Sequence, residues 1–109
     1  MGAGRDADAE KMNRDALRLR PDASGTHMRY GAFLYNRGRH KEAADHFRHA
    51  TKLVPDFSHA WANLGGALQA LDRHDEAQAA YERSLAISPK LLTAYNEFSR
   101  IIWRSMRVG

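Results

Sequence analysis

The sequence predicts an all-α protein, an α-solenoid of antiparallel helix hairpins, and two observations carry that prediction. The three prolines, Pro21, Pro55 and Pro89, stand 34 residues apart. Between them, apolar residues recur every three or four positions, which is the spacing of an amphipathic helix. Because one helical pattern is repeated at a fixed period, we expect similar units that stack side by side and bury a continuous core.

Six helices follow from this periodicity, each ended by a proline or by a short polar turn. The turns are only a few residues long, so successive helices should be antiparallel neighbours. In chain order, we expect helices at about residues 6–19, 25–37, 41–53, 58–71, 75–87 and 91–106.

The expected helix ends carry residues with suitable backbone preferences. Gly38 follows the second helix and can adopt the left-handed conformation that closes a helix. Asp72 stands one period later and tolerates that conformation better than most side chains. At the helix starts, Asp22 or Ser24 and, one period on, Ser58 are expected to cap the free backbone N–H groups.

Many positions agree between the two complete units. The second unit has Trp61, Leu64, Gly65, Ala77, Tyr81 and Pro89, and the first has Tyr30, Gly31, Leu34, Ala43, Phe47 and Pro55. This pattern resembles the tetratricopeptide repeat, with His27 in place of the large aromatic residue of the first unit. The resemblance implies one domain over residues 1–109, divided into a half repeat (6–21), two full repeats (24–57 and 58–91) and a terminal helix (92–106).

Small residues are expected where the helices of each unit cross. Gly31 and Gly65 would let two backbones approach, while Phe47 and Tyr81 fill the adjoining space. Replacing Gly65 with a large residue should therefore destabilise the fold by overpacking.

Composition narrows the functional classes. The chain has 109 residues, 17 Lys and Arg against 13 Asp and Glu, and no Cys, which excludes disulfides and thiolate chemistry. No apolar run has the length of a signal peptide or a membrane span, so we expect a cytoplasmic protein without membrane contact. Basic residues are spread over all the helices, a distribution that does not favour nucleic-acid binding.

Neither catalysis nor a metal site is indicated. The sequence contains no nucleophile elbow, phosphate-binding loop or dinucleotide motif, so we expect no enzyme activity and no cofactor. Although His46 and His49 are three residues apart, a stable site needs further ligands. We expect the six histidines to be ordinary surface or helix-start residues.

The family resemblance implies a protein-binding groove on the inner face. The residues expected to project there are Arg29, Asn36, His59, Asn63, Gln69, Asn96 and Arg100, with the small residues Ala32, Ala62 and Gly66 leaving room for a ligand backbone. Some members of the family grip a C-terminal carboxylate with Lys, Asn and Arg side chains. Only Asn63 fits that set here, so the resemblance implies a different peptide or helix as ligand.

Two alternatives to a free-standing binding module remain open. The chain could be a docking or regulatory segment of a larger enzyme such as a transferase. It could also be a structural module that self-associates as a homo-oligomer, because the last helix lacks the second helix that would normally cover it. The expected contact surface consists of Tyr95, Ile102, Trp103 and Met106.

Overall fold

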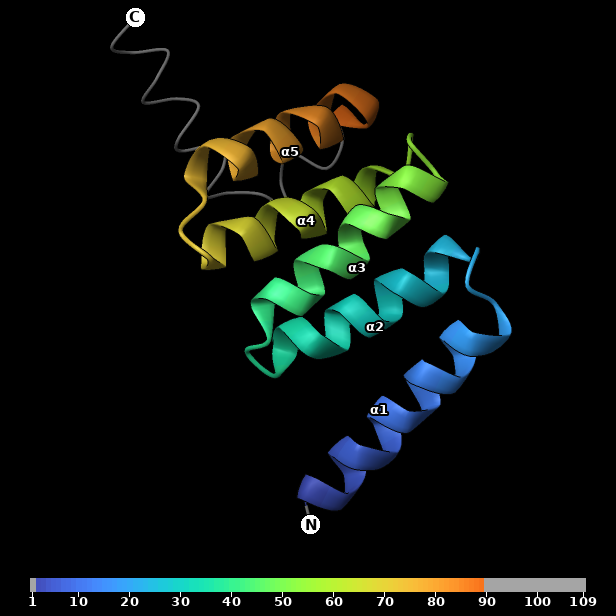
Figure 1. Ribbon diagram of the computed structural model, residues 1–109. Coiled ribbons are helices and arrows are strands. Elements are labelled where there is room, and N and C mark those ends of the chain that lie inside the picture. The colour runs from blue at the N-terminus through green and yellow to red at the C-terminus, as the bar shows by residue number, and fades with distance from the viewer. Residues whose placement is uncertain (1, 90–109) are drawn as a thin grey trace, which may run out of the picture.

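The computed structural model describes residues 2–89, which form five helices and contain no strand. The helices lie side by side in chain order, with α1 at one edge and α5 at the other (Figure 1). Their bounds are α1 Gly2–Leu19, α2 Ser24–Asn36, α3 His40–Leu53, α4 Ser58–Ala70 and α5 His74–Ile87. The all-α solenoid expected from the sequence is confirmed, and α1 begins earlier than residue 6. The helix expected at 91–106 lies outside the described residues.

Two helix hairpins, α2–α3 and α4–α5, repeat the same turn. The turn after α2 contains Gly38 with φ of 79°, and the turn after α4 contains Asp72 with φ of 62°. In each turn the next residue donates its backbone N–H back into the helix, from Arg39 to Leu34 and from Arg73 to Leu68, both at 2.9 Å. Both left-handed residues expected from the sequence are therefore present.

The expected serine caps are wrong. Ala23 and Phe57 hold the extended backbone conformation that precedes α2 and α4, so Ser24 and Ser58 are the first residues inside these helices. Neither helix has a side-chain hydrogen bond at its N-cap.

One buried core runs through both hairpins. Phe47 of α3 lies over Gly31 of α2, and Tyr81 of α5 lies over Gly65 of α4. A Cβ atom added at Gly31 would come within 2.6 Å of the Phe47 ring, and one at Gly65 within 2.9 Å of the Tyr81 ring. The small residues thus stand where the helices approach most closely, as the sequence predicts. The remaining buried residues of the core are Tyr30, Leu34, Ala43, Ala44, Leu64, Ala67, Leu68, Ala77 and Ala80.

Candidate functional site

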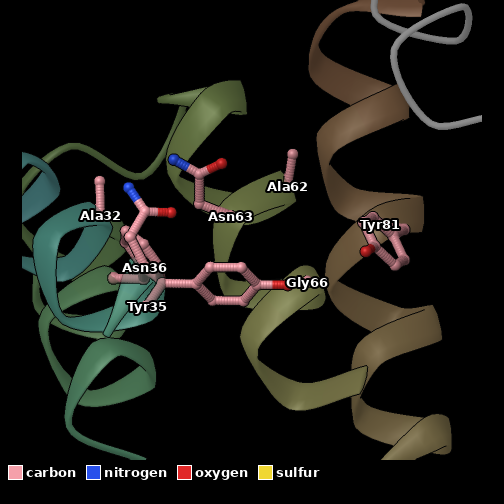
Figure 2. Close-up of a pocket in the computed structure, with 8 residues that line it drawn as sticks. Ala32, Tyr35, Asn36, Ala62, Asn63, Gly66 and Tyr81 are labelled. Carbon is pink, nitrogen blue, oxygen red and sulfur yellow. The ribbon is translucent and has the colours of Figure 1, made fainter. Parts of the chain in front are cut away.

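A cavity of about 310 Å³ is lined mainly by α2 and α4, with one residue each from α3 and α5 (Figure 2). The side chains at its mouth come from the inner faces of the first helix of each hairpin. In Figure 2 the Tyr35 ring projects from α2 towards Gly66 of α4, while Asn36 and Asn63 lie together on the same side of the cavity. The lining residues are Ala32, Tyr35, Asn36, Phe47, Ala62, Asn63, Gly66 and Tyr81.

The described residues that line this cavity carry no charge. Their polar groups are the amides of Asn36 and Asn63 and the hydroxyls of Tyr35 and Tyr81. Phe47, which is 2% exposed, gives the cavity an apolar floor. Amides can donate and accept hydrogen bonds but cannot act as an acid, base or nucleophile at neutral pH, so this arrangement suits binding.

The amide of Asn63, at the mouth of the cavity, has a weak internal contact. The Asn63 Nδ2 atom donates to the sulfur of Met28 at 3.9 Å, and sulfur is a weak acceptor. The Tyr81 hydroxyl donates to Oε1 of Gln69 at 3.2 Å. The Asn63 amide can therefore exchange its weak bond for a stronger one to a ligand.

The structure brings together part of the expected groove set. Asn36 and Asn63 line the cavity, and Gln69 is attached to its wall through Tyr81. Arg29 and His59 are exposed and do not line it. Asn96, Arg100 and the expected self-association surface Tyr95, Ile102, Trp103 and Met106 lie outside the described residues, so these assignments stay predictions.

Sequence reasoning missed the aromatic lining. Tyr35 stands one period before Gln69, an expected groove residue, so the 34-residue period is the signal that identifies Tyr35. The rings of Phe47 and Tyr81 were assigned to packing alone. Each ring packs over its glycine and also lines the cavity.

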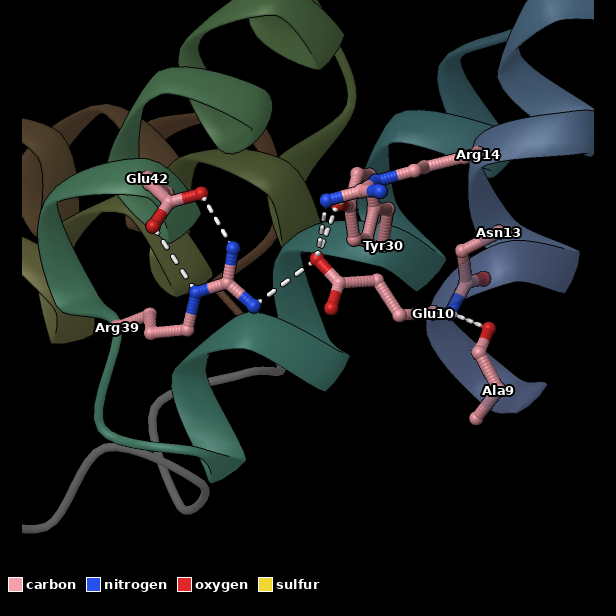
Figure 3. Close-up of polar contacts among 7 residues, drawn as sticks. All are labelled: Ala9, Glu10, Asn13, Arg14, Tyr30, Arg39 and Glu42. Carbon is pink, nitrogen blue, oxygen red and sulfur yellow. Dashed lines mark hydrogen bonds and ion pairs between the residues drawn. The ribbon is translucent and has the colours of Figure 1, made fainter. Parts of the chain in front are cut away.

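A second polar constellation attaches α1 to the first hairpin (Figure 3). One carboxylate oxygen of Glu10, Oε2, accepts three hydrogen bonds, from the Tyr30 hydroxyl at 2.8 Å, Arg39 at 2.9 Å and Arg14 at 3.1 Å. Arg39 also forms a two-pronged pair with Glu42, at 2.9 and 2.8 Å. The hydrogen bond from Tyr30, followed by that from Arg39, lowers the pKa of Glu10. This network favours the ionised form of Glu10 and holds α1 against α2 and the turn before α3.

Within residues 2–89, no three His, Asp or Glu side chains are arranged to hold a metal ion. His27 lies in the first turn of α2, as expected for a helix-start histidine, but it is not at the surface: it is only 7% exposed and occupies the position that Trp61 fills one period later. In the same stretch of chain, no helix is both long enough and apolar enough to cross a membrane.

Comparison with known proteins agrees with this geometry. The sequence pattern of the tetratricopeptide repeat matches residues 22–90. The chain belongs to the tetratricopeptide repeat family. Repeats of this family are protein-interaction modules and are typically not enzymes. A search of curated proteins found no significant match.

Many solved structures share the fold, including the two that follow. The first tetratricopeptide domain of Spaghetti (RPAP3), bound to the HSP90 peptide SRMEEVD, has a TM-score of 0.83 at 21% identity, over 96% of this chain and 83% of that one. MamA has a TM-score of 0.77 at 24% identity, over 87% of this chain. This chain spans 56% of the length of the MamA chain.

Proposed function

We propose that the protein binds an extended segment of a partner protein along the face lined by α2 and α4. The observation that carries this proposal is the uncharged, aromatic-floored cavity with two amide side chains at its mouth. Family membership supports it, since tetratricopeptide repeats are protein-interaction modules. The cavity volume of about 310 Å³ is at the small end of the range for ligand sites, which suits one or two side chains of a peptide.

The lining indicates how such a segment would be held. Asn36 and Asn63 can pair with the N–H and C=O groups of an extended backbone, which otherwise lose their bonds to water on binding. Ala32 and Gly66 leave space for that backbone to approach. Phe47 and the neighbouring tyrosines then receive an apolar or amide side chain.

The same lining argues against an acidic peptide. The Spaghetti domain is bound to SRMEEVD, which contains three acidic residues. A buried carboxylate needs a cationic or hydrogen-bonding partner that repays its loss of hydration. No Lys or Arg lines the described cavity. We therefore propose that the seated side chain is neutral and that the bound segment is not a terminal carboxylate.

A selection experiment with a matched pair of variants tests this proposal. Random heptapeptides displayed on phage are selected on the wild-type protein, and the enriched peptides are measured by fluorescence anisotropy. Leu at position 66 should fill the cavity, because a Cβ atom there meets only the Tyr81 hydroxyl oxygen, at 3.6 Å. Gly66→Leu should therefore weaken binding at least about tenfold. Ala70→Leu places the same leucine side chain at an exposed site on α4 and should leave binding unchanged.

Three outcomes would contradict the proposal. One is that no sequence is enriched. A second is that the selected peptides bind Gly66→Leu and wild type equally while circular dichroism shows both folded. The third concerns the charge of the ligand. Synthetic SRMEEVD with a free carboxylate serves as an acidic probe and should bind more weakly than a selected neutral peptide. Tighter binding of SRMEEVD would contradict the proposal that the cavity accepts a neutral side chain.

A further inference from the structure

Three imidazole rings meet where the turn after α1 reaches the first hairpin. The Nε2 atom of His27, on α2, lies 2.9 Å from the carbonyl oxygen of Pro21. Its Nδ1 atom lies 3.2 Å from Nδ1 of His46, on α3. The His49 ring, also on α3, stacks on His27 with centroids 4.9 Å apart and an interplanar angle of 11°. We call His27, His46 and His49 the imidazole cluster.

The hydrogen bonds limit how many protons the cluster can hold. A carbonyl oxygen can only accept, so Nε2 of His27 carries a hydrogen. In the uncharged ring, Nδ1 of His27 then has a lone pair and accepts the Nδ1 hydrogen of His46. One added proton can be accommodated on this pair. If both rings were charged, two N–H groups would face each other across 3.2 Å and the bond would be lost.

The surroundings of His46 also oppose a positive charge. Burial, followed by repulsion from His27 and His49, lowers the pKa of His46. Asp45 and Glu42, on the same helix, act in the opposite direction but do not cancel the effect.

The carboxylates near the cluster have competing partners. Asp45 lies 3.8 Å from Arg48, and Glu42 is held by Arg39. From α2, the Tyr30 ring packs on His46 with centroids 4.7 Å apart. The Tyr30 hydroxyl faces α1, where it is bonded to Glu10 and to Arg14. Both acidic groups on α3 are thus shared with arginines, which limits how far they favour a charge in the cluster.

In the second hairpin, the positions equivalent to the imidazole cluster hold no titratable ring. Trp61 stands 34 residues after His27, and its Nε1 donates to the Pro55 carbonyl at 2.8 Å, just as His27 does to Pro21. Arg83 replaces His49 and lies over the Trp61 ring, 5.9 Å from its centroid. Ala80 replaces His46. An indole N–H does not titrate, so this joint is unaffected by protons near neutral pH.

We propose that the imidazole cluster makes the attachment of α1 to the first hairpin a proton-sensitive joint, closed when the rings are uncharged and opened by acid. In the unfolded chain each histidine takes up a proton near its ordinary pKa of 6.5. The folded cluster excludes at least one of these protons. Its stabilising contribution is therefore complete above pH 6.5 and is lost as the pH falls below it. This inference does not depend on the peptide groove.

Transplanting the second joint into the first hairpin tests the proposal. The variant His27→Trp/His46→Ala/His49→Arg replaces the imidazole cluster with the residues found one period later. Urea unfolding gives the equilibrium constant at several pH values between about 6 and about 5. Each excluded proton multiplies the unfolding constant about tenfold per pH unit. We expect the wild-type slope to exceed that of the triple variant by at least one such factor, and equal slopes would overturn the proposal.

Two further measurements keep the test decisive if the triple variant folds poorly. In wild type, NMR titration should show His46 taking up its proton below the ordinary histidine pKa of 6.5, and a titration at or above that value would overturn the proposal. His59→Gln, the control variant, should keep the wild-type slope. Amide exchange near pH 5, corrected for intrinsic rates, should increase in α1 and the start of α2 relative to α4 and α5; a uniform increase would refute a local joint.

Discussion

Helix α2 meets the helix before it through a polar network, beside which Leu17 of α1 packs against the core, whereas α4 meets its predecessor through apolar side chains alone in the equivalent positions. Glu10 of α1 bonds to Tyr30 of α2, and one period later these positions are Ala44 and Leu64, both part of the buried core. The two hairpins share their turns and their glycine contacts, so the fold tolerates either kind of joint. The difference teaches that the repeat pattern specifies how a hairpin closes but not how neighbouring units are joined. The first joint should respond to pH, and the second should not.

The hairpin interior is where the two units should agree most closely, and glycine substitutions test this with the largest expected effect. Gly31→Ala and Gly65→Ala each place a methyl group within 3 Å of an aromatic ring, at 2.6 and 2.9 Å. Because Phe47 and Tyr81 are buried and cannot move freely, we expect each variant to lower the free energy of unfolding by about 1 to 3 kcal/mol, with Gly31 the more sensitive. Urea denaturation measures the loss.

Gly66→Ala is the matched control on α4. Its added Cβ would make ordinary van der Waals contact at 3.6 Å, and alanine favours helix over glycine. We expect the free energy of unfolding to rise by about 0.5 to 1 kcal/mol. Equal destabilisation by all three substitutions would show that helix geometry, rather than ring contact, sets the glycine requirement.

Glu10→Gln probes the polar joint, with an intermediate expected effect. The amide keeps the shape of the side chain but replaces a carboxylate that accepts three hydrogen bonds, so we expect a loss of about 1 to 2 kcal/mol. The pKa of Glu10 is lowered in the fold, so its contribution is present above the ordinary carboxyl pKa of 4.5 and is lost as pH falls below that value.

Unfolding curves at neutral pH and near pH 3 test this. The difference between Glu10→Gln and wild type should shrink in acid, because protonation abolishes the same charge. A constant difference would show that the Glu10 charge contributes nothing to the joint. This window lies below that of the imidazole cluster, so the two effects can be separated along the pH axis.

The turns carry the smallest expected effect, with opposite signs in the two hairpins. Gly38→Ala forces a Cβ into the left-handed region and should cost about 1 kcal/mol. Asp72→Gly removes that strain at the equivalent turn and should be neutral or stabilising by up to about 1 kcal/mol. Thermal unfolding of the two variants checks the signs, and a loss in both would mean that the Asp72 side chain contributes to its turn.

A feature could be predicted from the sequence when the residues that determine it are close together in the chain. The helices, their ends at the prolines and the left-handed turn at Asp72 are determined by residues close together in the chain. All five described helices accordingly lie near their expected positions. The glycine contacts came from the family pattern. The capping serines were misplaced by one residue, because the chain enters each helix at Ala23 and Phe57, which no side-chain preference indicated.

The polar network and the imidazole cluster could not be read from the sequence. The polar network joins side chains from three segments, and the partners of Glu10 lie as far as 29 residues away. The imidazole cluster joins side chains of α2 and α3 to the backbone carbonyl of Pro21. A helix period gives the face of each residue but not which atoms on different helices come within 3 Å of one another. The substitution of His27 for an aromatic residue was visible in the sequence. Its partner His46 became apparent only with α3 packed against α2.

A ring nitrogen in each unit bonds to the proline carbonyl six residues earlier. Because the serine caps are absent, this bond is a side-chain contact that fixes the start of the helix. In both units it ties the connecting turn to the following helix, from His27 to Pro21 and from Trp61 to Pro55. Only His and Trp carry a ring N–H, so Phe or Tyr at these positions would leave the carbonyl without its donor. Anyone building longer arrays from these units should regard the proline and the ring as a single connector, to be copied together.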